Sequence, residues 1–215
     1  MRKLPPELAG HPDRLRWNAR YEAGAGTSFR PHPLATQALS LPLPDGPVLD
    51  LAGGPSGSVL LAAAAGRPVT AVDISEVALG LLAAEARRRG AGELLTLVHA
   101  DLRSWRPQPG RYSLVLCTSY WDRSLFAAAA AAVAPGGLLG WEAFTTEVLR
   151  SRPGLSPEWC LAPGEPASLL PAGCTILSQP DQPDDQPGSP EPASRAGARH
   201  AATRRLLARR GPEPA

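Results

Sequence analysis

Between Pro47 and Trp141, short apolar runs alternate with longer runs of helical pattern, and no other feature of the sequence constrains the fold as strongly. Such alternation is typical of βαβ units built around a parallel sheet. The sequence therefore predicts an α/β fold with a doubly wound, mostly parallel sheet in a single domain. We expect strands over residues 48–52, 68–73, 94–99, 112–117 and 137–141, and helices over residues 57–65, 77–89 and 123–134.

The two ends of the chain are richer in proline than this middle part. Five of the 25 prolines lie in residues 48–150, against eight in residues 1–47 and twelve in residues 151–215. Because proline disrupts helix and strand interiors, we expect regular structure mainly in the middle. We divide the chain into an N-terminal cover segment (1–46), the main domain (47–178), a flexible Pro/Asp-rich loop (179–198), and a last strand with a tail (199–215).

Two further strands are expected near the C-terminus. One covers residues 174–178, and an edge strand between residues 200 and 210 returns to the sheet, although a basic helix is the alternative for that second segment. With the five strands above, this gives a seven-stranded sheet.

Lysine is almost absent from the chain, since Lys3 is the only lysine among 22 basic residues. The chain therefore has no P-loop lysine for a nucleoside triphosphate, no Schiff-base lysine and no Tyr-x-x-x-Lys pair of reductases. A formal net charge of +2 creates no field that would favour nucleic acid or an anionic membrane. The scarcity of lysine thus excludes several mechanisms, whereas the net charge by itself decides nothing about partners. We expect a small-molecule methyl acceptor, and neither nucleic acid nor a membrane, as the partner.

The three cysteines, Cys117, Cys160 and Cys174, form no C-x-x-C pair, so neither a metal site nor a disulfide framework is predicted. The N-terminus has no apolar signal region, and no stretch approaches the roughly 18 apolar residues of a membrane helix. We expect a soluble, cytoplasmic protein that is a monomer or a homodimer.

A glycine-rich turn follows the first expected strand in the segment Val48-Leu49-Asp50-Leu51-Ala52-Gly53-Gly54-Pro55-Ser56-Gly57. Gly54 and Gly57 lack a Cβ, so the backbone can approach a ligand closely, and the helix that follows presents free N–H groups at its start. The spacing Ala52-x-Gly54-x-x-Gly57 also approximates a dinucleotide fingerprint. The turn alone therefore leaves a nicotinamide-dependent oxidoreductase open.

An acidic residue ends the second expected strand, and another follows the third. Asp73 lies 23 residues after Asp50 and can accept both hydroxyls of a ribose, and Asp101 has the same relative place after the third strand, where it could accept an adenine amino group. With Asp50 before the glycines, the pattern resembles that of the class I S-adenosylmethionine-dependent methyltransferases, whose fold is Rossmann-like. The resemblance covers residues 48 to about 141.

This resemblance implies a set of residues that bind S-adenosyl-L-methionine. The first acid and the glycine turn would hold its methionine end, and they fall here on Asp50, Ala52, Gly53, Gly54 and Gly57. The ribose would bind Asp73, with Ile74 on the adenine, and the adenine edge would meet Asp101 and Leu102. Cys117, Thr118 and Ser119 would flank the methionine and the transferable methyl group.

A closer resemblance links the chain to small methyltransferases of the tellurite-resistance and thiopurine (thiol) group. Trp17, Arg20 and Tyr21 match a Trp-x-x-Arg-Tyr segment that lies over the cofactor in that group. Two further matches cover residues 121–126 and 135–145, and Pro163-Gly164-Glu165 resembles the tripeptide that precedes the group's last helix. Gly53 departs from the pattern, because many relatives have cysteine there.

Candidate catalytic residues follow the fourth and fifth strands. Tyr120 and Trp121 are candidates for the substrate pocket, and Arg123 and Glu142 are candidates for acid/base or oxyanion chemistry, with a surface ion pair or a helix cap as the alternative for each charged residue. The segment Thr118-Ser119-Tyr120-Trp121 stands where amine-methylating enzymes often carry Asp/Asn-Pro-Pro-Tyr/Phe, which argues against an exocyclic amine acceptor.

These observations together predict an S-adenosylmethionine-dependent methyltransferase that transfers a methyl group to a small molecule by in-line displacement. Two alternatives stay open. One is the nicotinamide-dependent oxidoreductase, and the other is a protein that binds S-adenosylmethionine without catalysis.

Overall fold

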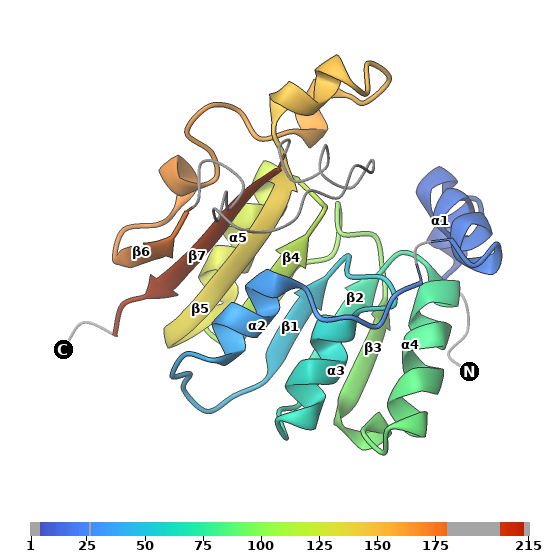
Figure 1. Ribbon diagram of the computed structural model, residues 1–215, viewed down its shortest axis with the longest axis horizontal. Coiled ribbons are helices and arrows are strands. Elements are labelled where there is room, and N and C mark those ends of the chain that lie inside the picture. The colour runs from blue at the N-terminus through green and yellow to red at the C-terminus, as the bar shows by residue number, and fades with distance from the viewer. Residues whose placement is uncertain (1–4, 26, 180–202, 213–215) are drawn as a thin grey trace, which may run out of the picture.

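The computed structural model describes residues 5–25, 27–179 and 203–212, and these contain one seven-stranded sheet (Figure 1). The strand order is β3-β2-β1-β4-β5-β7-β6, in which β1 to β5 run parallel and β7 runs antiparallel to both of its neighbours. The expected Rossmann-like, mostly parallel sheet is thus confirmed. The strands are β1 (Val48–Leu51), β2 (Val69–Asp73), β3 (Leu95–His99), β4 (Tyr112–Thr118), β5 (Val133–Phe144), β6 (Cys174–Ser178) and β7 (Thr203–Arg210).

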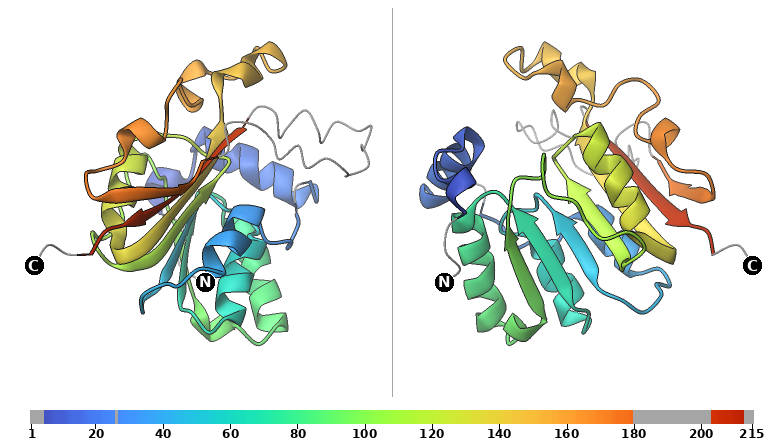
Figure 2. Two further views of the ribbon diagram at one scale, coloured as in Figure 1. Left: turned by 60° about the vertical axis from the view of Figure 1, so that its left-hand side comes forward. Right: turned by 180° about the vertical axis from the view of Figure 1, so that it is seen from behind.

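Helices cover both faces of the sheet. On one face lie α2 (Pro33–Leu39), α3 (Gly57–Ala64) and α4 (Glu76–Arg88), and on the other lies α5 (Arg123–Ala132), which the view from behind shows across β4 and β5 (Figure 2). Side chains alternate between the two faces along each strand, so that Val48 packs toward α2 and α3 whereas Leu49 packs toward α5. Both sides are apolar because both are covered.

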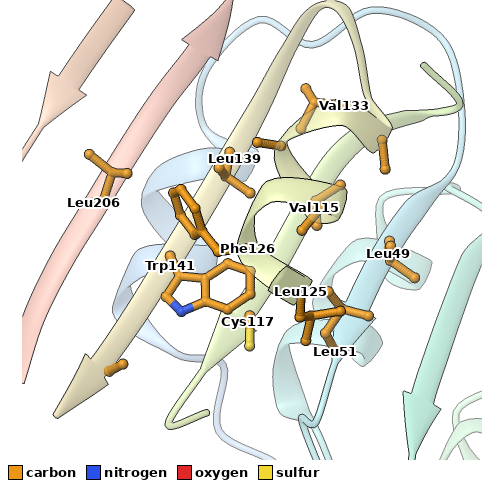
Figure 3. Packing of buried hydrophobic residues seen from close by; sticks show 14 of the residues in the cluster. Leu49, Leu51, Val115, Cys117, Leu125, Phe126, Val133, Leu139, Trp141 and Leu206 are labelled. Carbon is orange, nitrogen blue, oxygen red and sulfur yellow. The ribbon is translucent and has the colours of Figure 1, made fainter. Parts of the chain in front are cut away.

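The aromatic core lies on the α5 side, where Trp141 of β5 packs against Phe126 (Figure 3). Trp121 contacts both of these rings. The ring centroids of Phe126 and Trp141 are 5.1 Å apart with the planes at 75°, an edge-to-face arrangement. Trp141 is therefore a core residue.

The N-terminal segment contains more regular structure than its proline content predicts. It forms α1 (Pro12–Glu22) and α2, and each begins with a proline in its first turn after a histidine cap. The prolines mark these helix starts because a first-turn residue needs no N–H partner within the helix. The prolines in this segment are thus compatible with helices.

The chain after β5 is irregular, as its composition indicates. Three short 3₁₀ helices, η3 (Thr146–Arg150), η4 (Pro157–Trp159) and η5 (Ala167–Leu169), connect β5 to β6. The resemblance implied a helix after Pro163-Gly164-Glu165, and this expectation is wrong, because only η5 follows. Pro166 and Pro171 flank that turn and prevent a longer helix.

The expected strands at the C-terminus are both present, and β7 inserts between β5 and β6. The predicted loop over 179–198 lies outside the described residues except for residue 179. In the part of the chain that the structure describes, no helix has the length and apolar character needed to cross a bilayer.

Candidate functional site

Polar residues gather where β1, β2, β4 and β5 end, at one edge of the sheet. In parallel sheets this carboxyl edge is where ligands bind. Helix α1 lies at the same edge, next to the start of α4 (Figure 1). The candidate site is therefore built from strand ends, the glycine turn after β1 and α1.

The backbone of the glycine turn is strained where it leaves β1. Ala52 and Gly54 both have positive φ, at 53° and 60°, and such a conformation costs energy at a residue with a side chain. A Cβ on Gly53 would collide with the Asp50 carboxylate, and one on Gly54 would collide with the Tyr21 hydroxyl. The turn thus needs small residues because the protein's own side chains crowd it.

Gly57 is required for a reason that the sequence did not indicate. A Cβ there would overlap the backbone of Phe29 and Arg30, which crosses the first turn of α3. The N-terminal segment is therefore packed directly on the glycine turn, and Gly57 serves this packing.

Replacing Gly57 by alanine is expected to lower the free energy of unfolding by about 1–3 kcal/mol, because neither backbone can move aside cheaply. Urea titration followed by circular dichroism measures this change. Gly80→Ala in α4 is the matched control, since a Cβ there meets no atom within 4 Å and the alanine should stabilise the helix by about 0.5–1 kcal/mol. Equal stability of the two variants would contradict the prediction.

Asp50 is buried beneath the turn. The Ser56 hydroxyl, which also caps α3, donates to Asp50 Oδ2 at 2.5 Å. Burial raises the pKa of Asp50 to about 6; the hydrogen bond from Ser56 opposes the increase, Asp73 adds to it and His32 opposes it. A cationic group bound here would favour the ionised form of Asp50.

Asp73, at the end of β2, links the glycine turn to β2 by a hydrogen bond. Its Oδ2 accepts the Gly54 N–H at 2.9 Å and its Oδ1 accepts the Ser75 N–H at 2.8 Å. Each carboxylate oxygen retains a second lone pair, which fits a pair of neighbouring hydroxyls. Burial raises the pKa of Asp73, and the two backbone hydrogen bonds oppose that increase.

Tyr21 brings α1 to the glycine turn. Its hydroxyl lies against Gly54, and burial together with the nearby Asp73 raises the pKa of Tyr21 to about 12. Trp17 stacks on Tyr21 with ring centroids 5.9 Å apart, and the Arg20 guanidinium lies 5.7 Å from the Trp17 ring. Of the three, Tyr21 reaches the glycine turn.

The third acid, Asp101, follows β3 at the same edge. Its Oδ1 accepts the Arg103 N–H at 2.9 Å, and its Oδ2 lies 3.5 Å from His11 Nε2 at the start of α1. Leu102 is buried beside it, and the Ile74 carbonyl lies 2.9 Å from His99 Nε2. Asp50 in β1, Asp73 at the end of β2 and Asp101 after β3 thus lie at the same edge of three neighbouring strands.

The exit of β4 is held by hydrogen bonds to backbone atoms. The Tyr120 carbonyl accepts from Trp141 Nε1 at 3.1 Å and from Cys117 Sγ at 3.7 Å, and Ser119, after Thr118, has a φ of 72°. Burial raises the pKa of the Cys117 thiol well above its ordinary value, so Cys117 is a poor nucleophile.

The charged candidates at this edge have ion-pair partners. Arg123 forms a two-point ion pair with Glu165, through N–O distances of 2.6 and 3.0 Å. Glu142 Oε2 pairs with Arg205, and its Oε1 lies 3.4 Å from His32 Nε2. Arg123 thus forms the surface ion pair that was its alternative, whereas the ion pair of Glu142 is buried.

The two aromatic candidates differ in exposure. Tyr120 is half-buried, whereas Trp121 is buried in the aromatic core and its Nε1 has no hydrogen-bond partner among the described residues. Of these two, Tyr120 is the one with surface available to a ligand.

His32, Ser56 and Arg205 contact the site residues but were not among the predicted site residues. The dipeptide His-Pro at 11–12 and again at 32–33 was a usable signal, because a capping residue before a first-turn proline marks a helix start. No local pattern pairs Arg205 with Glu142, which lies 63 residues earlier.

One family model matches the middle of the chain. Residues 48–137 match a family model described as a methyltransferase domain. No curated protein matches the sequence.

Solved structures share the fold at low sequence identity. A structure concerned with the conversion of a disulfide bond into a thioacetal group during echinomycin biosynthesis is 17% identical, covers 93% of both chains and has a TM-score of 0.64. Geranyl diphosphate C-methyltransferase from Streptomyces coelicolor A3(2) is 15% identical over 82% of this chain and 74% of that one, with a TM-score of 0.62. An S-adenosylmethionine-dependent methyltransferase from Mesorhizobium loti is 18% identical over 83% and 96%, with a TM-score of 0.60.

The domain match favours a methyltransferase over the nicotinamide-dependent alternative. The three acids, the small-residue turn and the start of α3 provide a donor set that fits S-adenosylmethionine. Residues 48–137 match a methyltransferase domain and the chain has the class I methyltransferase fold, which together support an S-adenosylmethionine-dependent methyltransferase.

Proposed function

We propose that this enzyme methylates a small molecule through a soft nucleophile, a thiol or a chalcogen oxyanion, as in the tellurite-resistance and thiopurine group. The observation that carries the proposal is that the titratable groups at the exits of β4 and β5 are weak bases. Such an acceptor is already anionic or easily ionised, so it needs no strong base.

The described groups at these exits are poor bases. Burial opposes ionisation of Glu142, but hydrogen bonds from His32 and Arg205 lower its pKa below the ordinary value, which makes it a weak base. Burial raises the pKa of Tyr120 to about 12. Asp122 caps α5 by accepting the Leu125 N–H at 2.7 Å. A hydroxyl or amine acceptor would need a proton acceptor that these residues do not offer.

The residues of the glycine turn would hold the cofactor. We assign the methionine end to Asp50 and to the turn from Ala52 to Gly57, the ribose to Asp73, and the adenine edge to Asp101 with Leu102 and Ile74. Cofactor bound there supplies a methyl group on a sulfonium, a leaving group that needs no protonation. Tyr21 and Trp17 would cover the site and exclude water, with Arg20 on the outer side.

The acceptor would enter beside Tyr120 and Thr118, at the exit of β4. The pair between Arg123 and Glu165 fixes the turn before η5 against the start of α5, and that turn also receives two hydrogen bonds from Arg204. The shape of the acceptor site would thus depend on the segment between β5 and β6.

Related structures support a small acceptor. The structure concerned with echinomycin biosynthesis involves sulfur chemistry, and geranyl diphosphate C-methyltransferase is named for a small-molecule substrate.

A panel of acceptors tests the proposal. Small thiols, selenite, tellurite, phenols and amines are each incubated with the enzyme and S-adenosylmethionine, and methylated products are measured by mass spectrometry. We expect transfer to sulfur or chalcogen acceptors and none to phenols or amines. Transfer to hydroxyl or amine acceptors alone would overturn the choice of acceptor, and cofactor binding without any transfer would favour a non-catalytic binding protein.

A further inference from the structure

His32 stands where α2 begins and uses both ring nitrogens. Its Nδ1 accepts the Leu34 N–H at 3.2 Å, which caps the helix. Because Nδ1 is an acceptor, the proton of the neutral ring is on Nε2. The cap therefore sets the tautomer in which Nε2 is a donor.

The Nε2–H group faces the carboxylate of Glu142 in β5. It lies 3.4 Å from Glu142 Oε1, at a carboxylate that is almost fully buried. The backbone carbonyl of Glu142 accepts the Ser119 N–H at 2.8 Å, and this bond fixes the exit of β4. His32 is thus connected through Glu142 to the strand end where the acceptor would bind.

The main chain of His32 contacts the first turn of α3, which follows the glycine turn. Its N–H donates to the Ser58 hydroxyl at 3.1 Å in the first turn of α3, next to Gly57. His32 therefore contacts Ser58, directly after the glycine turn, and Glu142, whose carbonyl holds the β4 exit.

We propose that His32 is a positioning residue that fixes the glycine turn and the exit of β4 relative to each other. It does so through Ser58, which follows the turn, and through Glu142, whose carbonyl holds the β4 exit. In-line displacement requires the reacting atoms about 3–3.5 Å apart and aligned, and a misplacement of about 1 Å can cost ~100-fold in rate. His32 does not act as a base in this arrangement, because both ring nitrogens are engaged with the protein.

Two substitutions separate this role from helix capping. His32→Asn keeps a side-chain oxygen that can cap α2 but has no group long enough to reach Glu142. His32→Gln has a terminal amide N–H that can reach Glu142 but is a poorer cap. Gln37→Ala, an exposed position on α2, is the control for general changes to this helix.

The inference rests on the proposed methyl transfer, so the first readout is turnover with the acceptor found above. For His32→Asn we expect kcat to fall 10–100-fold, while the KM for the cofactor and the midpoint of thermal unfolding stay close to wild type. His32→Gln should recover part of kcat. In combination with Glu142→Gln, His32→Asn should cause no further loss, because it acts through that carboxylate.

A second readout needs no acceptor. Binding of S-adenosylhomocysteine at the glycine turn should increase hydrogen-exchange protection of the Ser119 amide in the wild type and in His32→Gln, but not in His32→Asn. If the wild type shows this difference in protection but no turnover, the result counts against the proposed acceptor and not against the role of His32. The inference would be overturned by a kcat for His32→Asn within twofold of wild type, or by a parallel loss of stability and cofactor affinity in that variant. Equal protection of the Ser119 amide in all variants would also overturn it.

Discussion

Replacement of Asp73 by alanine is expected to weaken binding of S-adenosylmethionine and of S-adenosylhomocysteine by at least ~100-fold. The carboxylate would accept hydrogen bonds from the two ribose hydroxyls, and hydrogen bonds to a charged group contribute about 1.5–3 kcal/mol each. The carboxylate also positions the Gly54 and Ser75 N–H groups, so the turn loses its attachment to β2 as well. Isothermal titration calorimetry measures the affinity directly.

A stability measurement must accompany this titration, because Asp73→Ala leaves two backbone N–H groups without their acceptor. Asp73→Asn retains an acceptor oxygen for one of them and should be the more stable of the two variants, while still binding cofactor weakly. Asp45→Ala is the matched control, since Asp45 is an exposed aspartate before β1. Affinity of a folded Asp73→Ala variant within about fivefold of wild type would show that Asp73 does not hold the ribose.

The sheet could be predicted because its signals are local. Strands buried on both sides, such as Val48–Leu51 and Tyr112–Thr118, are mostly apolar, and the turns between the strands contain glycine or proline. Asp50, Asp73 and Asp101 could be predicted as site residues for the same reason, since each lies at or next to the end of a strand. Tyr21 required the family resemblance, because its contact with Gly54 spans 33 residues of sequence.

The contacts that complete the site are not local, and no period or motif encodes them. Arg205 reaches Glu142 because β7 runs antiparallel beside β5 with Glu142 opposite Arg205, a register that depends on the whole sheet. Gly57 likewise fits a ligand-binding turn, yet its missing side chain makes room for the Phe29 and Arg30 backbone. Residues with a plausible functional role can thus be required for packing.

Replacement of Trp141 by alanine is expected to lower the free energy of unfolding by about 3–5 kcal/mol, as is typical when a fully buried aromatic side chain is removed. Trp141 has no exposed surface and contacts the rings of Trp121 and Phe126 edge-on. The Tyr120 carbonyl would also lose its indole donor. Urea unfolding monitored by circular dichroism gives the loss, and a loss below about 1 kcal/mol would contradict a core role for this ring.

Trp141→Phe separates the packing role from the hydrogen bond. Phenylalanine retains much of the buried ring but cannot donate to the Tyr120 carbonyl, so we expect a smaller loss of about 1–1.5 kcal/mol. Since that bond helps to hold the β4 exit, methyl transfer should slow in this variant while the affinity for S-adenosylhomocysteine stays close to wild type. If the rate of methyl transfer and the affinity for S-adenosylhomocysteine fell by the same factor, the substitution would have disturbed the glycine turn as well as the β4 exit. That result would contradict a role of the hydrogen bond at the β4 exit alone.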